Sequence, residues 1–184
     1  MQELILGDKS NFALSAEVID NSTLEGYLFL HIAGKKFGYS ESPYGLEAAL
    51  SNVAEYFHVE QFDSKNLFDC PASILINAYR KCFEEEVDPS ELDVESASEL
   101  KLDDVNDYYL GFYDDFLKDD RLDNCVVRTG NYLLDGFLML AIPENKNVRF
   151  VIYDKKSGVV AEAVVVIDTF ESYASSLLSK LKNK

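Results

Sequence analysis

The 184-residue chain contains no tryptophan, two histidines, three cysteines, nine glycines and four prolines. So little glycine and proline excludes a fibrous repeat, and a hydrophobic fraction of 47% excludes disorder over most of the length. No stretch approaches the ~20 consecutive apolar residues of a membrane-spanning helix. The cysteines, Cys70, Cys82 and Cys125, lack metal or redox spacing, and the N-terminus lacks a basic signal-peptide region. We therefore expect a soluble, reduced, cytoplasmic protein.

Basic residues are also scarce, because 17 Lys and Arg accompany 33 Asp and Glu, for a net charge of −16. Residues 84–123 hold 16 acids and 3 bases, whereas the other 144 residues carry a net charge of only −3. Phosphates are bound by Lys and Arg, so nucleic acids and anionic membranes are disfavoured as partners. A concentrated negative field attracts basic proteins or cations. The alternative is that these acids only keep the surface soluble.

The N-terminal part predicts strands over 12–19, 27–32 and 37–39, with turn sequences between them. Ser42 and Pro43 are typical of a helix start, and apolar residues at helical spacing follow from 46 to 57.

The middle predicts a helix that begins at Cys70-Pro71 and runs to 83, where three glutamates precede the breaker Asp88-Pro89. We expect residues 87–102 to form an acidic loop and 105–117 to form a helix with an aromatic stripe.

The C-terminal part predicts strands over 132–142, 148–153 and 159–167, with turns over 143–147 and 154–158. Asp168 or Thr169 then caps a last helix that ends in three lysines, a charge that suits a helix C-terminus.

Both ends of the chain thus run strand, strand, strand, helix, with a helical acidic insert between them. This order predicts an α+β fold in which helices pack on antiparallel β-sheet. We expect a single domain over residues 1–184, with sheet and helix over 1–58, the insert over 59–124, and sheet and helix again over 125–184.

The sequence lacks the residues that the common catalytic motifs require. His31 lies within an apolar strand and is interpreted as a satisfied core histidine, and His58 as a helix-end residue. No Ser or Cys near either histidine completes a nucleophilic pattern, although spacing leaves open a pair that the fold assembles. Residues 6–10 lack the glycine spacing of a phosphate loop. We expect no enzyme and no cofactor.

The clustered carboxylates raise the possibility of a Mg²⁺ or Ca²⁺ site, because Asp103, Asp104 and Asp107, and likewise Asp115 and Asp119–Asp120, could share a helix face. No stretch has the spacing of a calcium-binding loop, so we favour a solvated acidic face and no metal.

Aromatic residues within the acidic segment indicate a second property. Tyr108, Tyr109, Phe112 and Phe116 fit a stripe that faces a core, whereas Tyr113 lies at the edge of that stripe beside Asp114. Tyrosine among acids is typical of a protein-binding surface.

Short motifs at both ends resemble a family of bacterial immunity proteins, the inhibitors of polymorphic or contact-dependent-inhibition toxins. The resemblance extends over about half the chain, at its two ends. It is carried by short motifs at residues 6–14, 32–38, 134–137, 148–153 and 168–171, and by the helix expected from Leu46. The chain departs from the family in having no tryptophan, and residues 58–124 match no motif of it. The resemblance implies no catalytic residues; it implies that the chain binds the C-terminal domain of one cognate toxin in the cytoplasm and blocks it.

The resemblance and the charge together predict an immunity protein that neutralises a basic toxin, most simply a nuclease, by occluding its substrate surface. A monomer is favoured, although the sequence leaves the oligomeric state open. Alternatives are an acidic mimic of nucleic acid, a carboxylate–metal enzyme and a chaperone for a secreted effector. The expected toxin-binding residues are Glu84, Glu85, Glu86, Asp103, Asp104, Asp107, Tyr113, Asp114, Asp115, Asp119 and Asp120.

Overall fold

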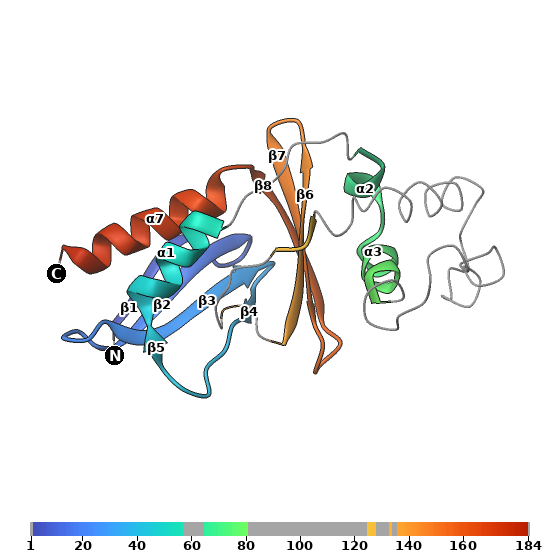
Figure 1. Ribbon diagram of the computed structural model, residues 1–184. Coiled ribbons are helices and arrows are strands. Elements are labelled where there is room, and N and C mark those ends of the chain that lie inside the picture. The colour runs from blue at the N-terminus through green and yellow to red at the C-terminus, as the bar shows by residue number, and fades with distance from the viewer. Residues whose placement is uncertain (1, 57–64, 81–124, 128–132, 134–135, 184) are drawn as a thin grey trace.

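A computed structural model describes residues 2–56, 65–80, 125–127, 133 and 136–183 (Figure 1). The first sheet, sheet A, has five antiparallel strands. Four of them follow the order β1 (Gln2–Asp8), β2 (Phe12–Asp20), β3 (Glu25–Ile32) and β4 (Lys35–Phe37). The fifth, β5 (Tyr44–Gly45), pairs with β3. Sheet B has the order β6 (Phe137–Glu144), β7 (Asn147–Asp154) and β8 (Val160–Val166). The helices are α1 (Leu46–Tyr56), α2 (Lys65–Asp69), α3 (Ala72–Tyr79) and α7 (Thr169–Lys182). The predicted α+β class is confirmed.

One hydrophobic core joins the two sheets with α1 and α7. The two helices lie side by side on one face of sheet A, and sheet B crosses the end of that sheet (Figure 1). Phe12 of β2 stacks on Phe150 of β7, with ring centroids 4.9 Å apart, and Phe170 of α7 packs edge-on against both. These three rings are almost fully buried, so they fix the position of α7 and sheet B relative to β2.

Strands β6 and β7 of sheet B are buried on both faces. Because side chains alternate along a strand, Met139, Phe150 and Ile152 point into the core shared with sheet A. Leu140 and Val151 point the other way and pack against α2 and α3 in a second cluster. The sheet therefore separates α2 and α3 from the rest of the core, which explains the nearly unbroken apolar sequence of β6 and β7.

Aspartates close the hairpin turns. Asp8 accepts hydrogen bonds from the Ser10 backbone N–H (2.8 Å) and hydroxyl (2.7 Å), and Asp20 accepts the same pair from Ser22. These hydrogen bonds lower the pKa of both carboxyls. Residues 8–10 are thus a turn between β1 and β2, a role that the Asp-x-Ser spacing supports.

The structure corrects several of the predicted boundaries. The strand predicted over 37–39 is observed as β4 (Lys35–Phe37), and the strand predicted over 132–142 begins only at Phe137. Strand β1 was not predicted, and it adds a strand before the expected ones. The predicted turn over 143–147 is wrong, because β6 continues through Pro143 and only two residues, of which Asn145 has a φ of 54°, form the turn. The predicted helix start at Ser42-Pro43 is also wrong, because Tyr44 holds this segment on β3 and α1 begins two residues later.

The C-terminal helix is where the sequence placed it. Asp168 is its N-cap residue, but its side chain makes no capping hydrogen bond. Lys180 and Lys182 occupy the last turn, and Lys182 pairs with Glu47 of α1 at 2.8 Å. The predicted loop over 87–102, the predicted helix over 105–117, Cys82 and His58 lie outside the described residues.

Candidate functional site

The predicted toxin-binding residues share one location in the chain, between α3 and the short segment Cys125–Val127. All of them lie outside the described residues, so they are located only by their place in the sequence. They are Glu84, Glu85, Glu86, Asp103, Asp104, Asp107, Tyr113, Asp114, Asp115, Asp119 and Asp120.

The described residues on either side of the acidic segment, residues 84–123, pack in the same hydrophobic cluster. Leu75 of α3 and Cys125 both belong to the cluster on the outer face of sheet B. Val126 forms an isolated bridge with Leu140 of β6, and the Val127 N–H donates to the Met139 carbonyl at 2.8 Å. The described residues on both sides of 81–124 therefore belong to one packed base, formed by β6, α3 and the residues that bridge to β6.

Arg149 of β7 ties this base together. Its Nη1 donates to the backbone carbonyls of Phe68 (2.7 Å) and Cys70 (2.5 Å), at the turn that joins α2 to α3. Its Nε and Nη2 donate to Glu162 of β8 at 3.0 and 2.5 Å. Arg149 is only 9% exposed, and its planar fork satisfies two carbonyls and a carboxylate at once.

Sequence reasoning missed Arg149 as an anchor. A usable signal was present, because Arg149 and Glu162 are single charges within two adjacent apolar strands. In the observed register Glu162 lies opposite Val151, which places both charged side chains on the outer face of sheet B as diagonal neighbours.

The two described cysteines belong to the same base and carry no reactive thiolate. Burial raises the pKa of the Cys70 thiol to about 12, against a smaller opposing effect of Arg149, and burial alone raises that of Cys125 to about 12. Both are free and buried, as the sequence-based interpretation of cysteines as small hydrophobes requires.

The fold does assemble one serine–histidine pair. Ser15 Oγ of β2 and His31 Nε2 of β3 lie 2.9 Å apart, on the face of sheet A opposite α1 and α7. Burial, followed by the charges of Lys9 and Lys36, lowers the pKa of His31 and keeps the imidazole neutral. Ser15 is 0% exposed, so its hydroxyl is not open to a substrate. The pair satisfies two buried polar groups, as the sequence-based interpretation of His31 predicts.

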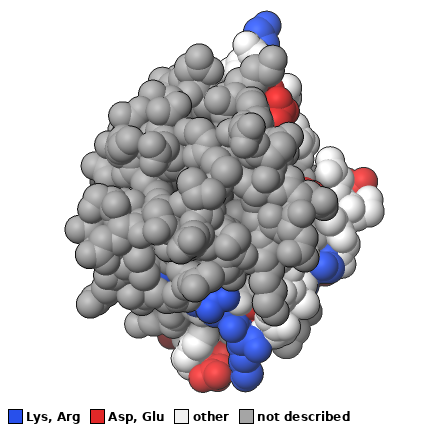
Figure 2. All heavy atoms as spheres, turned by 90° about the vertical axis from the view of Figure 1, so that its right-hand side faces the viewer, with Lys and Arg blue, Asp and Glu red and all other residues white. Residues whose placement is uncertain are grey.

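Charges on this face of sheet A balance one another. Lys9 pairs with Glu3 at 2.8 Å, and Lys36 pairs with Glu17 at 2.5 Å while its Nζ lies 3.6 Å from the centroid of the Phe29 ring. The described residues as a whole hold 14 acids and 11 bases. Both basic and acidic side chains are visible at the margin of the face seen from the side of α2 and α3 (Figure 2). The negative charge is therefore not concentrated in the described part of the chain.

The described part of the chain contains no group of three or more His, Cys, Asp or Glu side chains arranged to hold a metal ion. Among its helices, none combines the length and apolar character required to cross a membrane.

Comparison with solved structures shows a similar fold. The fold resembles that of CdiI from Burkholderia dolosa AUO158, with a TM-score of 0.58 and 16% sequence identity over 96% of this chain and 99% of that one. A search of curated proteins found no match.

A family model places the chain more closely. The model for Immunity protein 42 matches residues 4–180, so the chain belongs to the Immunity protein 42 family. The match includes the acidic segment and its base, and it confirms the family resemblance inferred from the ends of the sequence.

Proposed function

We propose that this immunity protein neutralises a basic toxin domain, most simply a nuclease, and that residues 84–123 supply the surface that meets it. The observation that carries the proposal is the net charge of −13 in those 40 residues, against −3 in the other 144. A nuclease needs a basic cleft for phosphates, and carboxylates on an inhibitor complement that cleft. The chain acts in this proposal as a cytoplasmic, non-enzymatic inhibitor that needs no metal or cofactor.

The base described above supports a role for the segment as a binding element. The described residues that flank it on both sides pack on sheet B, and Arg149 bonds the turn before α3. An interaction surface held at both ends loses less entropy on binding than a free tail. Steering by the acidic field also speeds capture, which benefits a cell that holds a lethal toxin. We propose that one chain occludes one toxin domain.

Binding to the toxin encoded beside this gene tests the proposal. The probe is the C-terminal domain of that toxin, inactivated by substitution, and its affinity is measured by calorimetry with the full-length chain. Replacing Asp103, Asp104, Asp107, Asp114 and Asp115 with Asn should weaken binding about 10- to 100-fold, mainly through slower association.

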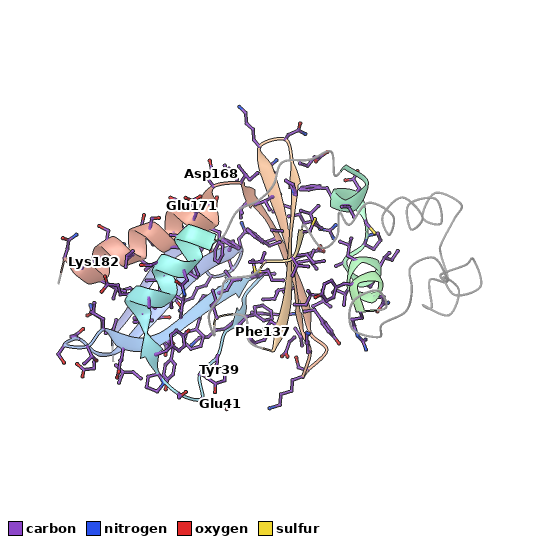
Figure 3. The ribbon with its side chains drawn as sticks, viewed as in Figure 1. Tyr39, Glu41, Phe137, Asp168, Glu171 and Lys182 are labelled. Carbon is purple, nitrogen blue, oxygen red and sulfur yellow. The ribbon has the colours of Figure 1, made fainter. Side chains whose placement is uncertain are left out.

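A matched control removes the same number of charges elsewhere. The exposed acids Glu3, Glu25, Glu41, Glu47 and Glu171, two of which are labelled in Figure 3, are replaced by amides. This variant should bind within about threefold of the unmodified chain. Equal losses in both variants would show that only total charge matters. No loss in the first would place the interface elsewhere.

A second probe separates immunity from mimicry of nucleic acid. An unrelated basic nuclease should not bind the chain at concentrations that saturate the cognate toxin domain. Similar affinity for both would favour a general mimic and contradict the proposal.

A further inference from the structure

Strand β8 has one unpaired edge. Sheet B runs β6, β7, β8, and within the described part of the chain β8 pairs only with β7. Lys35 of β4 reaches the start of this edge, where its Nζ donates to the Val160 carbonyl at 2.8 Å. The rest of the edge, from residue 162 to 166, is the subject of the inference.

The register determines which backbone groups face outward. Asp154 donates to the Val159 carbonyl (2.9 Å), and Ile167 donates to the Lys146 carbonyl (3.1 Å), so the odd-numbered residues of β8 bond to β7. Antiparallel ladders alternate, and the even-numbered residues therefore direct their N–H and C=O groups away from β7. The contact between Lys35 and the Val160 carbonyl agrees with this assignment. The outward-facing residues beyond it are Glu162, Val164 and Val166.

Beyond Val160, no lysine or proline side chain is observed on this edge among the described residues. Val164 is 49% exposed and Val166 is 60% exposed, two of the largest exposures among the described apolar side chains. Natural edge strands are usually blocked by lysine, proline or a bulge. The one charge here belongs to Glu162, and Arg149 pairs with it. At Glu162, Val164 and Val166 the outward backbone N–H and C=O groups are therefore available for pairing, two of the side chains are apolar, and the one charge is paired with Arg149.

We propose that this edge pairs with the same edge of a second copy of the chain. An antiparallel alignment about a twofold axis places Val164 opposite the partner's Val164 and Glu162 opposite the partner's Val166. Every outward-facing backbone group of these residues then meets a complementary group, and no carboxylate faces another. The contact between Lys35 and Val160 stays intact.

Charge complementarity at the ends favours a copy of this chain as the occupant. In this alignment the end that carries Lys35 approaches the end of the partner strand that carries Asp168, which follows β8 and is labelled in Figure 3. The twofold axis repeats this approach at the opposite end. Two cation–carboxylate contacts therefore flank the paired valines.

The acidic segment opposes the same association, because each chain carries a net charge of −16. Repulsion between two such chains is long-range and is screened by salt, whereas edge pairing is short-range. Self-association should therefore strengthen as salt rises, opposite to the behaviour expected for capture of a basic toxin.

Sedimentation equilibrium of the full-length chain, from micromolar to near-millimolar concentration, tests the inference. The average mass should rise from 20.8 kDa toward twice that value, and the rise should be larger at 500 mM than at 50 mM NaCl. Val164→Lys places a charge on the exposed edge, and that variant should remain at 20.8 kDa under all conditions. Val166→Lys provides a second variant of the same design.

Ile19→Lys is the matched control, because Ile19 is 47% exposed but lies on β2, in the other sheet. It should associate like the unmodified chain, and circular dichroism should be unchanged in all three variants. A constant mass of 20.8 kDa for the unmodified chain, or association of Val164→Lys to the same extent, would overturn the inference. Loss of toxin binding in Val164→Lys, with an unmodified chain that stays monomeric, would assign the edge to the toxin and also overturn it. The acid-to-amide test of the proposed function is independent of these outcomes.

Discussion

Removal of the Arg149 side chain should destabilise the protein far more than removal of its carboxylate partner. Arg149→Met keeps the aliphatic bulk but leaves the carbonyls of Phe68 and Cys70 without their donor, and Cys70 is 1% exposed. Each buried carbonyl left without its donor costs about 1–3 kcal/mol, so the loss of both contacts should cost about 2–4 kcal/mol. Glu162→Gln removes the charge from a side chain that is 53% exposed, so screening limits its cost to below about 1 kcal/mol.

Urea unfolding followed by circular dichroism measures the difference between the two variants. A domain of this size has a total stability of about 5–15 kcal/mol, so Arg149→Met should lower the midpoint clearly while Glu162→Gln scarcely moves it. Hydrogen exchange should show faster opening of α2 and α3 than of α1 and α7 in Arg149→Met. Equal midpoints for the two variants would refute the assignment of Arg149 as an anchor of the α2–α3 turn.

Three further predictions test the core and the buried polar groups. Phe150→Ala should lower the free energy of unfolding by about 3–5 kcal/mol in urea titration, because its fully buried ring contacts rings of β2 and α7; a loss below 1 kcal/mol would contradict this packing. The pKa of His31 is lower in the folded chain than in the unfolded chain, so its contribution to stability is complete above pH 6.5 and is lost as the pH falls below that value. Calorimetry should therefore show a smaller drop in Tm between pH 7.5 and 5.5 for His31→Gln than for the unmodified chain. An equal drop would contradict this. Burial raises the pKa of the Cys70 and Cys125 thiols to about 12. In a Cys82→Ser variant, a thiol reagent at pH 8 should therefore leave both cysteines unmodified until urea unfolds the chain. Rapid modification of the folded chain would show that the two thiols are accessible.

The sequence predicted those elements in which periodicity and core packing agree. The β-branched run over 159–167 gave β8 within one residue at each end, and the apolar spacing from Phe170 to Leu181 gave α7. In both, the apolar positions of the pattern include residues that the core buries.

The elements that were missed depend on neighbours distant in sequence. Strand β1 has only Leu4 and Leu6 packed against the core, too few to establish an alternation, and its pairing with β2 completes it. Pro143 favoured a turn, but β6 pairs there with β7 on one side, where a proline is tolerated near a strand end. Tyr44 forms β5 because its hydroxyl bonds the backbone of Leu28, a contact that no local pattern reveals.

Part of the candidate site could be predicted from the sequence, and part of it required the fold. The charge of the acidic segment is a property of the sequence and was found there. Its base was not, because Arg149 reaches carbonyls about 80 positions earlier in the chain and only the fold brings them together. The pairing of Ser15 with His31, 16 positions apart, likewise required the register of β2 and β3.

The central claim is that negative charge concentrated in residues 84–123 captures a basic toxin. The most direct test is the association rate of the full-length chain with its inactivated toxin domain, measured by stopped-flow between 50 and 500 mM NaCl. The account predicts a rate that falls steeply with salt, and a much shallower fall once Asp103, Asp104, Asp107, Asp114 and Asp115 are amides. A rate that is independent of salt, or a slope that those five substitutions leave unchanged, would contradict it.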